Sequence, residues 1–301
     1  MGLFDRLFGR KTAGAASGKS AEATGGRTAG ETSGKTAREA GAVSSDASGP
    51  LSAPVFRVGN IQGVGGREHQ EDSFAVLNVS DAEKLAERGL LAVVADGMGG
   101  MAGGEFASQC AVDSLIQSFE EWDGVSPVAD CLYSAAFAAS EQVFRQFGGM
   151  SGTTLTAVHI REDGLHWVSV GDSAIFLMRN GGVFQLNREH NYLNQLYARE
   201  LEEETIHKER AEQDVDARRL TSFVGIDHLR EVDLNLRPWR IRPGDVLLLC
   251  SDGISGVLTP PELKEAMSLD PDEGCALLET MIWEKQVLEQ DNYTGIMIAY
   301  R

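Results

Sequence analysis

Four short segments carry carboxylates next to glycine or small polar residues. They are Glu71-Asp72-Ser73, Asp96-Gly97-Met98-Gly99-Gly100, Ser251-Asp252-Gly253 and Gln290-Asp291-Asn292. Carboxylate and backbone carbonyl oxygens are the ligands that hard divalent cations prefer, and glycine allows a carbonyl or a second ligand to approach closely. Any one of these segments alone is ordinary turn chemistry, so only their combination indicates a metal site.

Two of the segments follow apolar runs that are typical of buried strands. Leu91–Ala95 leads into Asp96-Gly97, and Val246–Cys250 leads into Ser251-Asp252-Gly253. Both strands would deliver a carboxylate to one end of a sandwich. Buried carboxylates that converge there are strongly unfavourable unless a metal ion or a proton neutralises them. The sequence therefore predicts an acidic site that binds cations.

The elements expected to position these residues are short strands and paired helices. The strand candidates are Val55–Asn60, Phe74–Val79, Leu90–Ala95, Leu155–Ile160, His166–Val170, Ile175–Arg179, Val183–Leu186 and Tyr293–Tyr300. The helix candidates are Gly104–Phe119, Pro127–Phe147, Pro261–Met267 and Asp272–Leu288. Asn180-Gly181-Gly182 is typical of a hairpin turn. Hairpins and consecutive helices predict an α+β fold rather than alternating βαβ units.

Two further segments differ from this pattern. Arg188–Arg219 is highly charged and is expected to form a helical excursion over the surface. Residues 1–54 are rich in Gly, Ala, Ser and Thr, a composition that predicts a disordered tail. At its start, Leu3, Phe4, Leu7 and Phe8 would share one face of a short amphipathic helix within residues 1–11. This segment either docks weakly on a membrane or partner protein, or is a frayed terminus.

Charge and cysteine usage narrow the class of protein. The chain of 301 residues has a formal charge of −18. Seven basic and five acidic residues fall within 1–54, which leaves 20 basic and 40 acidic residues in 55–301. This part should repel nucleic acid and attract cations. The four cysteines form no CxxC pair and are expected to be reduced thiols of a cytoplasmic protein, and no apolar run is long enough to cross a bilayer.

Six motifs in order resemble the metal-dependent protein serine/threonine phosphatases of the PPM/PP2C type, and most closely their bacterial members. They are Gly65-Gly66-Arg67 with Glu71-Asp72-Ser73, Asp96–Gly100, Ser151–Thr154, Val170-Gly171-Asp172-Ser173, Ser251-Asp252-Gly253 and Asp291-Asn292. The resemblance extends from Val58 to Tyr300. It implies a four-layer αββα sandwich, with two mainly antiparallel sheets flanked by helices, in a phosphatase domain over residues 55–301. Residues 188–219 would be its flap.

The resemblance also implies a role for each motif residue. Asp96 would bridge two Mn²⁺ or Mg²⁺ ions with the Gly97 carbonyl on the first, and Asp252 and Asp291 would hold the second. Glu71 and Asp72 would act through metal-bound water, and Arg67 would bind the substrate phosphate through its bidentate fork. Asp172 would help to bind a third, weaker ion. The catalytic set is then Asp72, Asp96, Asp252 and Asp291.

Three functions are compatible with these motifs. The first is hydrolysis of phosphoserine and phosphothreonine in proteins, opposing a serine/threonine kinase. The second is a dedicated phosphatase of one partner-switching regulatory protein, and the third is a pseudophosphatase that only binds phosphoproteins. We expect a monomer that is cytoplasmic, or peripheral at the membrane through residues 1–11. His69 and His190 are expected to be polar surface residues rather than ligands, because oxygens already supply the site.

Overall fold

The computed structural model describes residues 55–99, 102–162, 164–204 and 207–301. The predictions of a disordered tail and of an amphipathic start fall on residues 1–54 and therefore lie outside the described residues.

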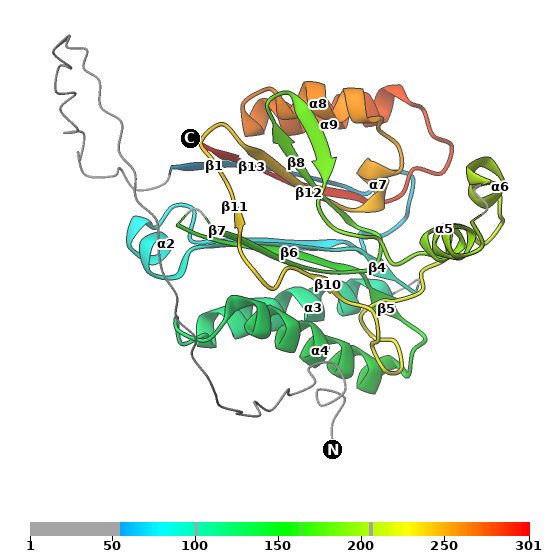
Figure 1. Cartoon of the computed structure of the whole chain (residues 1–301), viewed down its shortest axis with the longest axis horizontal. Coiled ribbons are helices and arrows are strands. Elements are labelled where there is room, and N and C mark those ends of the chain that lie inside the picture. Colours follow the sequence, from blue (N-terminus) through cyan, green and yellow to red (C-terminus); the bar gives the residue numbers. More distant parts are fainter. Residues whose placement is uncertain (1–54, 100–101, 163, 205–206) are drawn as a thin grey trace, which may run out of the picture. The chain divides into compact units, whose positions relative to one another are not determined.

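Two antiparallel sheets stack face to face in the folded unit (Figure 1). Sheet A has the strand order β1 (Phe56–Gly63), β13 (Tyr293–Tyr300), β12 (Val246–Cys250), β8 (Ala174–Arg179) and β9 (Gly182–Gln185). Sheet B has the order β10 (Asp233–Leu234), β7 (Gly164–Val170), β6 (Leu155–Arg161), β3 (Leu90–Ala95) and β2 (Ser73–Leu77), and β11 (Trp239–Arg240) also pairs with β7. The short strands β4 (Gly97–Met98) and β5 (Gly152–Thr153) pair with each other.

Helices cover the outer face of each sheet. The pair α8 (Pro260–Met267) and α9 (Pro271–Glu284) lies on sheet A, and the pair α3 (Ala102–Glu121) and α4 (Val128–Phe147) lies on sheet B (Figure 1). One apolar cluster fills the space between the sheets, and one lies under each helix pair. The predicted four-layer αββα sandwich is therefore confirmed.

Local sequence explains where several elements begin and end. Every residue of β3 is fully buried, because one face packs on the other sheet and the other face packs on helices. Thr259 and Glu262 form a capping box at the start of α8. Asn180 and Gly181 both have positive φ between the paired residues Arg179 and Gly182, as a two-residue hairpin turn requires.

The structure differs from the predicted elements mainly at short segments and ends. The helices α2 (Ala82–Arg88) and α7 (Asp252–Ser255) were not predicted, and α9 ends at Glu284 rather than Leu288. The charged excursion is helical as predicted, over α5 (Tyr192–Glu202) and α6 (Lys208–Glu212). Both helices extend at the same end of the sandwich as α7 (Figure 1).

The cysteines and the helix lengths agree with the sequence. Cys110, Cys250 and Cys275 are buried free thiols, and Cys131 is a half-buried one. Within the part of the chain that the structure describes, no helix is both long and apolar enough to span a bilayer.

Candidate active site

Asp96 follows the last residue of β3, and its backbone is held on both sides by the segment around β5. The Asp96 N–H donates to the Thr154 Oγ1 at 2.9 Å, and its carbonyl accepts from the Thr154 N–H at 2.8 Å and from the Thr153 hydroxyl at 2.9 Å. The Thr154 and Ser173 hydroxyls lie 2.7 Å apart. The end of β3 is therefore fixed, and the direction of the Asp96 side chain with it.

Asp72 lies immediately before β2 and is 5% exposed. The Ser251 hydroxyl donates to its Oδ2 at 3.0 Å and accepts from the Thr294 N–H at 2.9 Å. Among the described residues, the buried Asp72 Oδ1 has no hydrogen-bond partner. A buried carboxylate oxygen without a partner is costly, so this atom is available to a ligand.

The carboxylates of the four predicted segments lie near one another, and the carboxylate of Asp172 lies with them. Burial raises the pKa of Asp96 well above its usual range, and the charges of Asp72, Asp252, Asp172 and Asp291 raise it further. Burial and then the charge of Asp291 raise the pKa of Asp252, although a hydrogen bond with Asp96 opposes this. Strand ends from both sheets therefore bring these acidic groups together, as the apolar runs before Asp96 and Asp252 predicted.

The pKa values of three further acidic groups of the site are shifted in the same direction. Burial raises the pKa of Asp72 to about 6, against hydrogen bonds from Thr294 and Ser251 that lower it. Burial, followed by the charge of Asp252, raises the pKa of Asp172 to about 7. Burial also raises the pKa of Glu71. Such shifts mark a site whose carboxylates repel one another and are only partly balanced by the positive charges of nearby arginines.

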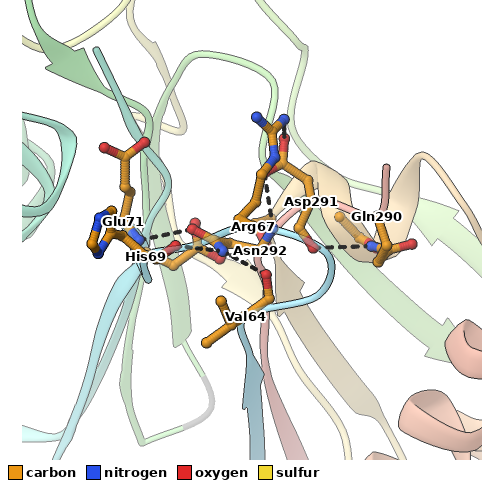
Figure 2. Close-up of polar contacts among 10 residues, drawn as sticks. Val64, Arg67, His69, Glu71, Gln290, Asp291 and Asn292 are labelled. Atoms are coloured by element: carbon orange, nitrogen blue, oxygen red, sulfur yellow. Dashed lines mark hydrogen bonds and ion pairs between the residues drawn. The ribbon is translucent and has the colours of Figure 1, made fainter. Parts of the chain in front are cut away.

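Arg67 and Asp291 form an ion pair at the rim of the site. The Arg67 Nη2 lies 2.8 Å from the Asp291 Oδ2, and both side chains are about half exposed. Figure 2 shows the guanidinium turned toward this carboxylate. The pair places a cation with a planar donor fork next to the acidic cluster, where a phosphate could meet it.

The donor set suits Mn²⁺ or Mg²⁺, because it consists of carboxylate and carbonyl oxygens. The buried Oδ1 of Asp72 and Oε1 of Glu71 have no partner in the described part of the chain. Within that part, no three Asp, Glu, His or Cys side chains are close enough together to hold an ion between them. Direct ligation of a shared ion by Asp96, Asp252 and Asp291 would therefore require these side chains to close around it, and the Asp291 carboxylate to turn from Arg67.

Gly97 is required by close packing of backbone in the site. A Cβ at this position would lie 2.3 Å from both the Glu71 and the Gly104 carbonyl oxygens, so any larger residue would displace one of these segments. This agrees with the expectation that glycine next to Asp96 permits a close approach.

The sequence interpretation missed one cation and misjudged one histidine. Arg218, from the charged segment 188–219, opposes the upward pKa shifts of Asp172 and Asp252. Its many charged neighbours in the sequence gave no sign of this role. His69 is exposed as predicted. The prediction for His190 is wrong, because it is 3% exposed. The ring Nδ1 of His190 accepts from the Gly171 N–H at 3.1 Å, and the backbone N–H of His190 donates to the Gly171 carbonyl at 2.8 Å. These hydrogen bonds allow the residue to lie in the interior.

Comparison with known proteins agrees with this fold and shows the family. The family described as protein phosphatase 2C matches residues 66–276. The serine/threonine phosphatase stp of Listeria innocua is 28% identical over 210 residues, which cover 67% of this chain and 78% of that protein. The serine/threonine protein phosphatase PstP of Mycobacterium tuberculosis is 32% identical over 188 residues, which cover 60% of this chain and 34% of that protein.

Solved structures give the same result. The crystal structure of the Mycobacterium tuberculosis phosphatase PstP/Ppp has a TM-score of 0.67 and 26% identity, and the match covers 81% of this chain and 98% of that one. The catalytic domain of PstP in complex with two manganese ions has a TM-score of 0.62 and 25% identity, over 82% of this chain and 99% of that one. The chain therefore belongs to the protein phosphatase 2C family. Its activity is that of a serine/threonine protein phosphatase, which acts on phosphoproteins.

Proposed function

We propose that this phosphatase works with two Mn²⁺ or Mg²⁺ ions held by the carboxylates described above. Asp96, the Gly97 carbonyl, Asp252 and Asp291 would hold these ions. Glu71 and Asp72 would act through water. When bound, the ions would activate a water for in-line attack on phosphorus and neutralise charge on the phosphoryl oxygens.

The observation that carries this proposal is the convergence of buried acidic groups from both sheets. Burial raises the pKa values of Asp72, Asp96 and Asp252, and the charge of Asp252 raises the first two further. A site of this kind is unfavourable alone and is stabilised by cations. Retention of all these carboxylates favours an enzyme over a pseudophosphatase, which has no need of them.

The chain's own residues would orient the substrate. Arg67 would donate two hydrogen bonds to the phosphate oxygens, because its guanidinium is always charged and its fork matches that geometry. Ser251 would keep Asp72 in one orientation through its 3.0 Å hydrogen bond. Asp172 would help to hold a third, weaker ion, which its elevated pKa near the Asp252 carboxylate supports.

The biological setting of the activity is also part of the proposal. The substrates would be phosphoproteins of a cognate serine/threonine kinase, and the protein would act as a monomer in the cytoplasm. The four free cysteines support a reducing compartment.

The test is hydrolysis of para-nitrophenyl phosphate and of a phosphothreonine peptide by the full chain, with Mn²⁺ and after exhaustive chelation. Asp252→Asn should lose more than roughly a hundredfold in turnover, since even a change in the partner of a metal ligand typically costs 10–100-fold in affinity or activity. Asp113→Asn, an exposed residue of α3, is the matched control and should retain full activity.

Two outcomes would contradict the proposal. Hydrolysis that persists unchanged after chelation would remove the role of the ions. A metal-loaded protein that is inactive on both substrates, yet binds a phosphothreonine peptide, would indicate the pseudophosphatase instead.

A further inference from the structure

The loop between β1 and β2 carries three residues of the proposed site and passes from sheet A to sheet B. Its first residues form a turn in which the Arg67 N–H donates to the Val64 carbonyl at 3.3 Å. Gly65 has φ +63°, and a Cβ there would lie 2.3 Å from the Asp291 carbonyl oxygen. The position of Arg67 therefore depends on how this turn is held, since its side chain is about half exposed and its guanidinium pairs with the Asp291 carboxylate.

One side chain holds both ends of this loop (Figure 2). The Nδ2 of Asn292 donates to the Val64 carbonyl at 2.8 Å and to the His69 carbonyl at 3.0 Å, and its Oδ1 accepts from the Glu71 N–H at 2.7 Å. Asn292 is 4% exposed, so these bonds are shielded from water. Both amide donors are used, and the ring of contacts fixes residues 64–71 as a unit.

The residues next to Asn292 in the sequence also bind this turn. The Gly66 N–H donates to the Gln290 carbonyl at 2.7 Å, and the Asp291 carboxylate pairs with Arg67. Asn292 itself is fixed because the next residue, Tyr293, begins β13 opposite Gly63 at the end of β1. The turn that presents Arg67 is thus attached to β13, an interior strand of sheet A.

Only an amide of this size satisfies the three backbone groups. Aspartate has nearly the same shape and keeps the acceptor, but it would place a carboxylate against the Val64 and His69 carbonyls. Alanine would leave two carbonyls and the Glu71 N–H without partners in a buried position. Each such unpaired group destabilises the fold.

We propose that Asn292 is a positioning residue that holds the 64–71 loop so that Arg67 faces the phosphate beside Asp291. This rests on the proposed role of Arg67 in binding phosphate. It assigns no chemistry to Asn292 itself, which acts on the reaction through the backbone of the loop.

The experiment is a double-mutant cycle of Asn292→Asp and Arg67→Ala in the full chain with Mn²⁺. Asn292→Asp should raise KM for para-nitrophenyl phosphate and the inhibition constant of inorganic phosphate roughly tenfold. The reason is that the charged hydrogen bond between Arg67 and the phosphate is lost or misaligned. On the Arg67→Ala background the same change should alter both constants less than about twofold, since residues acting through one contact are not additive. Asn292→Ala provides a second variant that adds no charge.

The matched control is Asn235→Asp. Asn235 makes the same set of bonds: it donates to the Leu165 and Arg237 carbonyls at 2.9 and 2.8 Å and accepts from the Trp167 N–H at 2.8 Å. Leu165 lies near the end of β7 remote from Asp172. This variant should lower the melting temperature to a similar degree but leave KM and phosphate inhibition unchanged.

Hydrogen exchange of the chelated protein provides a readout independent of turnover. Peptides that cover residues 64–71 should exchange faster in both Asn292 variants than in the parent and in Asn235→Asp. Unchanged exchange, or an active Asn292→Asp protein with unchanged phosphate inhibition, would overturn the positioning role alone. Independent effects would overturn it as well, that is, a double variant whose KM changes by the product of the two single fold-changes. A parent protein without metal-dependent hydrolysis would instead overturn the proposed function.

Discussion

Replacing Asp72 by Asn should stabilise the metal-free protein at neutral and alkaline pH. The carboxyl is 5% exposed, its Oδ1 has no partner among the described residues, and burial raises its pKa from 3.8 to about 6. As the pH rises from 4 to 6, the unfolded chain therefore releases this proton while the folded chain still holds it. Stability from Asp72 is complete below the unfolded pKa and is lost as the pH rises through the folded pKa.

The size of the effect follows from the shift of about two pH units. At 1.36 kcal/mol per unit, ionisation of Asp72 destabilises the fold by up to about 3 kcal/mol at pH 8 and by about half of that at pH 5. Asn has the same shape and does not ionise. For a domain of this size, 3 kcal/mol corresponds to a rise of about 6–12 °C in melting temperature.

The assay is thermal unfolding followed by circular dichroism in chelator, at pH 8 and pH 5. Addition of Mn²⁺ should reverse the order of the two melting temperatures. The ion stabilises the folded state that it binds, and the parent has a better site than Asp72→Asn. Asp245→Asn is a control for which the change in stability should have the opposite sign. Asp245 is equally buried but accepts two hydrogen bonds from Arg179 at 2.8 and 2.6 Å, so this change should destabilise at both pH values. A chelated Asp72→Asn protein that melts below the parent at pH 8 would refute the reasoning.

Three other variants test separate parts of the structure. Gly97→Ala should destabilise the fold by about 1–3 kcal/mol and abolish turnover, measured by unfolding and by phosphate release, because its Cβ would collide with the Glu71 carbonyl. Arg218→Ala should raise KM for a phosphopeptide roughly fivefold at most, an effect that high salt should remove. Deletion of residues 1–54 should leave kcat and KM for para-nitrophenyl phosphate unchanged, and a large loss would mean that the tail contacts the catalytic domain.

The sequence could predict the parts of the site that depend on local pattern. Asp96 and Asp252 each end an apolar run, and such a run fixes both the strand and the end at which the carboxylate appears. The strands β3 and β13 were predicted with their observed bounds for the same reason. A short helix that begins at Asp252 was missed, because Asp-Gly after a strand is by default a turn.

The rest depends on contacts between distant residues, which have no local signal. Asn292 contacts residues more than 220 positions away, so its part in holding the Arg67 loop was invisible in the sequence. His190 lies in a charged stretch that favours a surface position, yet backbone groups of Gly171 satisfy it in the interior. Hydrogen bonding to the backbone thus overrode the average preference of a residue type.

The place of β13 in sheet A sets the order in which the enzyme can be completed. Among the described elements β13 comes last along the chain, yet it lies between β1 and β12, and Phe56 pairs with Tyr300. During synthesis β1 therefore finds this neighbour only after all the other described elements have been made, and closure over such a distance is slow. Asp291 and Asn292 arrive with that same strand. A chain synthesised only as far as β12 therefore lacks both of these residues and the strand that pairs with β1.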